Sequence, residues 1–93
     1  MENKAMKVLI ADDEKDILEI ISYNLNQEGY DIYTAKDGNE ALEMARKIHP
    51  DLIILDIMMP YKTGIEVCEI LRSTEAFNST LIIFLTALND ETS

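Results

Sequence analysis

The sequence predicts an α/β fold in which a parallel sheet is covered by helices on both faces. Segments of strand length alternate with segments that carry apolar residues at helical spacing, a pattern typical of parallel strands joined by right-handed crossovers. The strand-like segments are almost continuously hydrophobic, as expected for strands buried on both faces. The three glycines and two prolines can each be placed at a junction. We therefore expect the 93 residues to form one layered domain.

The first part of the chain is predicted to contain a strand, a helix and a second strand. Met6–Ala11 is the first apolar run, and Asp16–Glu28 follows with helical spacing. Gly29 supplies the left-handed conformation that ends many helices, and Tyr30–Thr34 is a short second strand. The residues at helical spacing in the first helix are Ile17, Leu18, Ile21, Asn24 and Leu25.

A second predicted helix begins after Asp37 and ends before Pro50, and Asp51–Leu55 follows as the third strand. Asp37 and Glu40 have the spacing of a capping box, in which two side chains accept hydrogen bonds from each other's backbone N–H groups. The apolar face of this helix consists of Ala41, Leu42, Ala45 and Ile48.

The last part is predicted to contain a third helix, opened by Gly64, and a fourth strand at Leu81–Leu85. Cys68 lies on the apolar side of the third helix together with Ile65, Val67 and Leu71, so we assign it to packing. The polar tail from Asn89 to Ser93 is expected to fray.

Charge and composition exclude several classes of function. A formal net charge of −10 argues against a nucleic-acid surface in this segment, because phosphate backbones are met by clustered Lys and Arg. The single cysteine excludes an internal disulfide framework, and His49 has no partner for a zinc site, so we expect it on the surface. Neither a signal peptide nor a membrane-spanning stretch is evident. These features predict a soluble cytoplasmic protein.

Acidic residues follow two of the apolar runs. Asp12 and Asp13 come directly after Val8–Ala11, and Asp56 comes directly after Leu52–Leu55. The carboxyl ends of parallel strands lie at one edge of the sheet, so the three carboxylates should converge there. Two like charges about 4 Å apart repel by roughly 4 kcal/mol at an effective dielectric near 20. A hard divalent cation relieves this best, and Mg²⁺ suits an open site with few carboxylates.

The first acidic segment also has a simpler interpretation. Asp13 and Asp16 could merely favour the start of the next helix, where negative charge meets the positive end of the helix dipole. Asp56, placed in the same way after another buried strand, favours the metal site.

Four motifs together resemble the receiver domain of two-component response regulators. They are Val8–Glu14 (VLIADDE), Asp51–Pro60 (DLIILDIMMP), Gly64 and Leu85-Thr86-Ala87. The resemblance covers essentially the whole chain. It implies a flavodoxin-like three-layer sandwich with strand order 2-1-3-4 and a role in signal transduction.

The resemblance also implies roles for individual residues. Asp56 would be the phosphoacceptor, taking a phosphoryl group from the phosphohistidine of a sensor histidine kinase. The implied Mg²⁺ ligands are Asp12, Asp13, Asp56 and the backbone carbonyl of Met58. Thr86 would contact the phosphoryl group beside the small Ala87 as the switch, and Met59, Pro60 and Gly64 would form the active-site loop.

Each of these assignments has a structural alternative. Asp56 could cap the following loop, Met58 and Met59 could fill gaps in the core, and Thr86 could simply end a strand. The segment Tyr61–Thr63 departs from the family's usual acidic residue before the loop glycine, which should affect the loop and kinase preference more than the chemistry.

Relative to the family, the chain is expected to be an incomplete receiver domain, 1–93, truncated at its C-terminus. It lacks the fourth helix, the fifth strand and the fifth helix, and no residue matches the family lysine, since Lys15 and Lys62 occupy other positions. The fourth strand then becomes an apolar edge that invites a homodimer or a swapped assembly.

Three functions of different classes follow from these features. The first is a phosphoacceptor switch, which is not an enzyme acting on a separate metabolite. The second is a non-phosphorylated interaction module that dimerises through the fourth strand. A Mg²⁺-dependent phosphatase is weaker, because Met58 stands where a general acid is expected, and nucleotide binding is disfavoured because no Gly-rich phosphate loop is present.

Overall fold

The computed structural model describes residues 4–85 of the chain. These residues form one parallel sheet with the order β2-β1-β3-β4, which confirms the predicted topology. The strands are β1 (Lys7–Ala11), β2 (Asp31–Ala35), β3 (Leu52–Asp56) and β4 (Leu81–Leu85).

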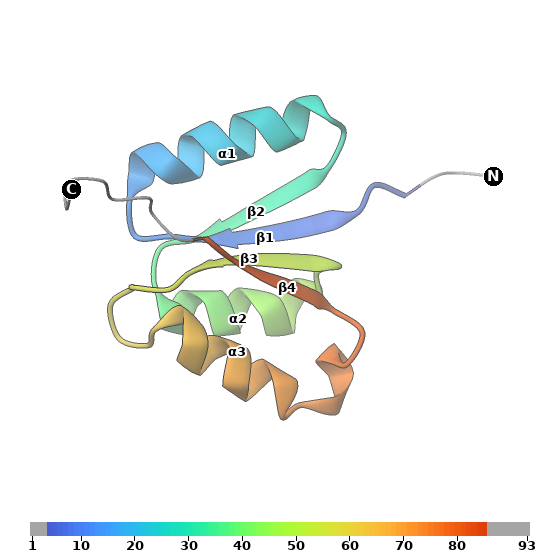
Figure 1. The fold of residues 1–93 in the computed structure, drawn as a ribbon. Coiled ribbons are helices and arrows are strands. Elements are labelled where there is room, and N and C mark those ends of the chain that lie inside the picture. The colour runs from blue at the N-terminus through green and yellow to red at the C-terminus, as the bar shows by residue number, and fades with distance from the viewer. Residues whose placement is uncertain (1–3, 86–93) are drawn as a thin grey trace.

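Helices cover both faces of this sheet. One face carries α1 (Lys15–Gln27), and the opposite face carries α2 (Gly38–Ile48) and α3 (Gly64–Arg72), so that three layers are visible in Figure 1. A short 3-10 helix, η1 (Glu75–Phe77), precedes β4 and was not predicted. Most predicted boundaries differ from the observed ones by a single residue, the usual uncertainty at the ends of elements.

The apolar core has two parts, one on each side of the sheet. Successive residues of a strand point to opposite faces, so Leu9 and Ile53 join the larger cluster beneath α2 and α3, whereas Val8, Ile10 and Ile54 join the smaller cluster beneath α1. The side chains of α1 that pack on this smaller cluster are Leu18, Ile21 and Leu25. Both faces are therefore apolar, as the continuous hydrophobic strands predicted. Cys68 is half-buried against the larger cluster, which confirms its packing role.

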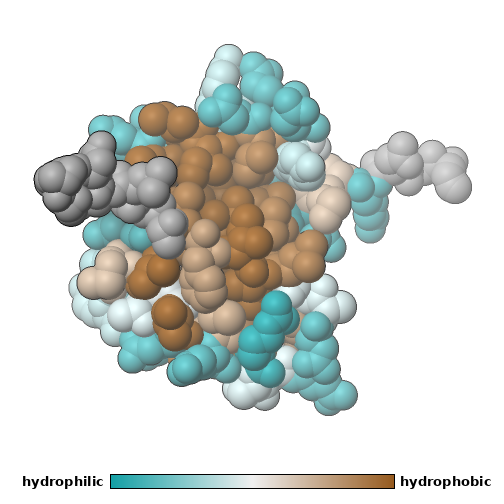
Figure 2. All heavy atoms as spheres, viewed as in Figure 1, coloured by the Kyte–Doolittle hydropathy of each residue, from teal (hydrophilic) through white to brown (hydrophobic). Residues whose placement is uncertain are grey.

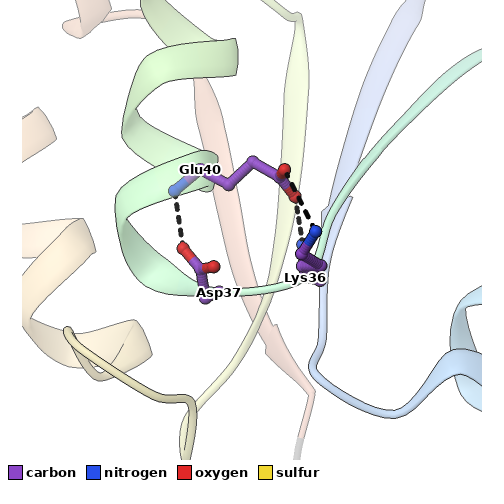
Figure 3. A network of polar contacts seen from close by, with 3 residues as sticks. All are labelled: Lys36, Asp37 and Glu40. Carbon is purple, nitrogen blue, oxygen red and sulfur yellow. Dashed lines mark hydrogen bonds and ion pairs between the residues drawn. The ribbon is translucent and has the colours of Figure 1, made fainter.

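The helix ends confirm one prediction and correct another. Gly29 has φ 95, the left-handed conformation expected after α1. The capping box predicted at the start of α2 is only half formed. Asp37 Oδ1 accepts a hydrogen bond from Glu40 N at 2.8 Å, but Glu40 Oε1 accepts from Lys36 N at 2.7 Å instead of from Asp37 (Figure 3). The Glu40 carboxylate therefore reaches one residue further back than the motif requires.

A complete capping box opens α3. Glu66 N donates to Thr63 Oγ1 at 3.1 Å, and Thr63 N donates to Glu66 Oε1 at 2.8 Å. The Thr-x-x-Glu spacing before an apolar helix was the signal that could have revealed it.

His49 ends α2 in the left-handed conformation, with φ 50. It is exposed, as predicted, but its ring stacks on that of the buried Phe77, with centroids 5.4 Å apart and an interplanar angle of 17°. Within residues 4–85, no helix combines the length and apolar character needed to cross a bilayer.

The edge strand β4 exposes apolar side chains. Leu81, Ile83 and Phe84 keep 61%, 50% and 41% of their surface accessible. In Figure 2, apolar residues gather across the middle of the view, between polar surfaces at the top and bottom. The predicted apolar edge is therefore confirmed for the described residues.

Candidate functional site

Three carboxylates meet at the carboxyl edge of the sheet. The register pairs Ala11 of β1 with Leu55 of β3, so the residues that follow them, Asp12 and Asp56, are neighbours. Asp13 completes the group, and one oxygen from each of the three side chains lies within 4.8 Å of the others. Parallel pairing of the two strands thus produces the convergence that the sequence predicted.

The three acids differ in burial and in how firmly they are held. Asp12 is 4% exposed, and its Oδ1 accepts a hydrogen bond from Glu14 N at 2.8 Å. Its own backbone N–H donates to Ala35 O at 3.1 Å, which ties the end of β1 to the end of β2. Asp56 is half-buried and Asp13 is exposed. The cluster therefore has one fixed buried carboxylate and an open side.

The electrostatics of the cluster act mainly on Asp56. Its pKa is raised from the ordinary value of 3.8 to about 6, chiefly because burial removes water from the carboxylate and then because Asp12 repels its charge. A hydrogen bond from the Met58 backbone lowers the pKa, whereas Asp13 and Glu14 raise it further. Asp56 is thus a carboxylate whose charge is poorly compensated.

This donor set fits a hard divalent cation. All three ligating atoms are carboxylate oxygens, which Mg²⁺ and Ca²⁺ prefer, and the exposed side leaves room for the waters that Mg²⁺ retains. Within residues 4–85, the only ion pair joins Lys36 and Glu40, so no cationic side chain pairs with the cluster there. A bound cation would offset both the burial and the repulsion that raise the pKa of Asp56.

The loop after β3 is tightly constrained. Lys62 N donates to Pro60 O at 2.8 Å, and the intervening Tyr61 has φ 69, which together close a γ-turn, a rare and strained conformation for a non-glycine residue. Gly64 N donates to Ile57 O at 2.8 Å. The first residues of α3 are thereby held against the end of β3.

The backbone around position 64 leaves no room for a side chain, so only glycine fits there. A Cβ atom at this position would collide with the backbone carbonyl oxygen of Asp56 and would lie 3.1 Å from Ile57 Cα. Met59 anchors the same loop in the core with 8% exposure, whereas Met58 is 72% exposed. The gap-filling alternative therefore describes Met59 and does not describe Met58.

A hollow of about 250 Å³ opens beside the acids, between α1 and the end of β4. Asp12 and Asp56 contribute to one part of its wall, and Ile17, Ile20 and Leu85 contribute apolar surface. Thr86 and Ala87, the predicted switch residues, lie outside the described residues.

Two features of the site were not found from the sequence. The Ala35 carbonyl accepts from Asp12, and Gly38 packs against the loop after β3, with its N–H 3.3 Å from Pro60 O. A glycine at the first position of a helix, directly after a capping aspartate, was the available signal for the second.

Comparison with known proteins agrees with this geometry. A family model described as the response regulator receiver domain matches residues 8–93. The chain belongs to this family. Receiver domains are regulatory modules of two-component systems that work with sensor histidine kinases, and a phosphoacceptor role is general among them.

One relative is similar to most of this chain. It is 47% identical over 85 residues to the alkaline phosphatase synthesis transcriptional regulatory protein PhoP of Bacillus subtilis, covering 91% of this chain and 35% of PhoP. The chain thus spans about a third of the length of that relative.

Solved structures share the fold throughout. The chemotaxis response regulator CheY4 of Vibrio cholerae is 37% identical, with a TM-score of 0.87, and the match covers 97% of this chain and 76% of that one. The receiver domain of the Francisella response regulator 1452 is 39% identical, with a TM-score of 0.82, and the match covers 94% of this chain and 70% of that one.

Proposed function

We propose that this receiver domain accepts a phosphoryl group on Asp56 from the phosphohistidine of a sensor histidine kinase, in a Mg²⁺-dependent reaction. The observation that carries the proposal is the convergence of Asp12, Asp13 and Asp56, with one oxygen from each within 4.8 Å of the others. Asp56 is half-buried at the end of β3, where its carboxylate is accessible to a donor.

The chemistry is a nucleophilic displacement at phosphorus. An oxygen of the ionised Asp56 carboxylate forms the new O–P bond while the N–P bond of the phosphohistidine breaks, and the imidazole nitrogen retains the electron pair. Mg²⁺, held by Asp12, Asp13, Asp56 and the Met58 carbonyl, would neutralise charge on the nucleophile and the transferred group. Burial and neighbouring acids raise the pKa of Asp56 and so favour its protonated form. A cation bound beside it would lower this pKa and favour the ionised nucleophile.

Other residues orient the carboxylates of the cluster and keep one side of it open to the phosphoryl donor. Glu14 N–H holds the buried Asp12 carboxylate in one orientation, so this ligand needs no reordering when a cation binds. Gly64 keeps α3 close to the Asp56 backbone, and Met59 fixes the loop in the core. Asp13 remains on the exposed side, where a phosphoryl donor can approach.

The test is phosphorylation by acetyl phosphate with and without Mg²⁺, followed by intact mass. We expect an acid-labile, hydroxylamine-labile mass gain of one phosphoryl group that requires Mg²⁺ and disappears in Asp56→Asn. Asp16→Asn is the matched control, because Asp16 is an exposed acid on α1 outside the cluster. Equal labelling of wild-type protein and Asp56→Asn would contradict the proposal.

A second candidate function is a non-phosphorylated interaction module that forms a homodimer or a swapped assembly through β4. The exposed Leu81, Ile83 and Phe84 on an edge strand favour it. Light scattering coupled to size-exclusion chromatography tests this: we expect dimers of the wild type at high concentration and monomers of Ile83→Lys. Monomeric wild-type protein at every concentration would contradict self-association.

We further propose that residues 1–93 act as a single receiver domain in the cytoplasm and do not turn over a separate metabolite. The three α-helices within residues 4–85 all contribute side chains to the apolar clusters on the two faces of one sheet, which supports a single unit. The net charge of −10 supports the absence of a nucleic-acid surface in this segment.

A further inference from the structure

The turn between β2 and α2 touches both of the loops that carry the acidic cluster. At its start, Ala35 O accepts a hydrogen bond from Asp12 N at 3.1 Å. At its end, Gly38 N donates to Pro60 O at 3.3 Å. The short segment 35–38 therefore links the backbone at Asp12 to the loop that follows Asp56.

Gly38 is packed so closely that no side chain fits. A Cβ atom there would lie 2.6 Å from Lys62 Cβ and 2.9 Å from the Lys62 carbonyl carbon, and it would collide with the Lys62 carbonyl oxygen. Since two of these three atoms belong to the backbone, a change of side-chain rotamer cannot relieve the contact. Any residue larger than glycine must displace the loop after β3 or the start of α2.

The turn itself resists displacement. Asp37 accepts from Glu40 N, and Glu40 accepts from Lys36 N, so two side chains hold the backbone N–H groups on either side of Gly38 (Figure 3). Lys36 Nζ also lies 3.9 Å from Glu40 Oε2. Gly38 itself is buried at the first position of α2. Because the turn is held in this way, a steric conflict at Gly38 is expected to displace the loop after β3 as well as the start of α2.

We propose that Gly38 is a positioning residue for phosphoryl transfer, acting through its contact with the Pro60–Lys62 backbone. The inference rests on the proposed function of Asp56. The loop that Gly38 contacts begins at the nucleophile and carries Met58, so its placement sets these groups relative to Asp12. Displacements of about 1 Å at reacting groups can slow a reaction about a hundredfold.

The decisive variant is Gly38→Ala, with Gly29→Ala as its matched control. Gly29 has φ 95, and a Cβ atom there would have no atoms within 4 Å, so alanine at this position strains the backbone without touching the loop. Both variants are measured for thermal stability, for Mg²⁺ affinity by amide chemical shifts, and for acetyl-phosphate labelling rate at saturating Mg²⁺.

We expect Gly38→Ala to weaken Mg²⁺ binding and to slow labelling, each by about tenfold or more. The amide resonances of Met58 and Lys62 should shift even without metal. Gly29→Ala should lower thermal stability while retaining wild-type Mg²⁺ affinity and labelling rate. Equal losses of affinity in the two variants, or wild-type behaviour of Gly38→Ala, would overturn the inference.

A second pair of variants addresses the case in which Gly38→Ala does not fold. Glu40→Ala removes the acceptor of Lys36 N–H and loosens the turn, whereas Glu40→Gln keeps an oxygen acceptor. We expect a several-fold loss of Mg²⁺ affinity in the alanine variant and recovery in the glutamine variant. Identical affinity in both would count against the inference, whereas a wild type that neither binds Mg²⁺ nor becomes labelled would instead contradict the proposed function.

Discussion

At the scale of single residues, Asp56 belongs to the acidic cluster and carries an unfavourable charge. Burial and the neighbouring acids raise its pKa to about 6, so the folded protein binds a proton there more tightly than the unfolded chain, in which the pKa is near 3.8. The stabilising effect of the proton is complete below about pH 4 and is lost as the pH rises through about 6. The Asp56 carboxylate thus lowers the stability of the metal-free protein at neutral pH.

The loss of stability caused by ionised Asp56 predicts that Asp56→Asn is more stable than the wild type at neutral pH. A pKa raised from 3.8 to about 6 corresponds to about 3 kcal/mol, which partial exposure of Asp56 to solvent reduces to about 1–2 kcal/mol. We expect the variant to exceed the wild type in unfolding free energy by this amount at neutral pH without Mg²⁺. The measurement is urea unfolding of both proteins across the acidic to neutral range.

The difference should shrink as the pH falls toward about 4, because both side chains are then uncharged. Asp16→Asn, at an exposed position on α1, provides the control and should show no comparable gain. A difference between Asp56→Asn and wild type that stays constant with pH would contradict the assignment of the raised pKa to Asp56.

At the scale of elements, α3 begins at the capping box of Thr63 and Glu66, directly after the loop that follows β3. Thr63→Ala removes one acceptor of the box and should lower the unfolding free energy by about 1 kcal/mol. Ser79→Ala, an exposed hydroxyl substitution before β4, serves as the control and should change it little. Chemical denaturation of the two variants measures the difference. Equal stability of both would show that the box contributes nothing to α3.

Within residues 4–85, the two outer strands of the sheet, β2 and β4, differ in the polarity of their exposed side chains. β2 places the polar residues Asp31 and Thr34 on exposed positions, and Tyr33 OH donates to Asp31 Oδ2 at 3.0 Å. β4 instead exposes Leu81, Ile83 and Phe84. Charged and polar side chains protect an edge against pairing with another chain, whereas an apolar edge favours it. Among the strands within residues 4–85, the self-association proposed above should therefore involve β4 and not β2.

At the scale of the whole molecule, the chain has a net charge of −10, and three of its acids form the cluster. Within residues 4–85, no lysine or arginine forms an ion pair with these acids, so a bound cation would compensate their charge. A ligand that binds only the folded state stabilises it by about 2.7 kcal/mol at a concentration of 100 times its Kd. We therefore expect Mg²⁺ to raise the thermal unfolding temperature of the wild type, and a chelator to reverse the effect. Differential scanning calorimetry provides the measurement.

General screening of an acidic protein by salt must be separated from binding at the site. KCl at matched ionic strength is the solution control, since it screens surface charge without occupying the carboxylates. Asp13→Asn is the variant control, because it removes one exposed member of the cluster. The same rise in KCl as in MgCl₂ would show that Mg²⁺ acts only through ionic strength.

The architecture and the acidic cluster were predictable because each rests on a repeated local pattern. The continuous apolar runs at Val8–Ala11 and Leu52–Leu55 predict buried parallel strands, and such strands bring their carboxyl ends to one edge. The convergence of Asp12, Asp13 and Asp56 then follows from the chain order. The strand order followed from the family resemblance, whose motifs span most of the chain.

The contacts that adjust the site depended on tertiary structure. The packing of Gly38 on Lys62 and the hydrogen bond from Asp12 to Ala35 join residues far apart in sequence. The reach of Glu40 to Lys36 is local, but the path of the turn before α2 determines it. Hydrophobic periodicity determines which face of an element is buried. Which backbone atoms meet across neighbouring loops is decided only when register, crossovers and turn conformations combine in one packed structure.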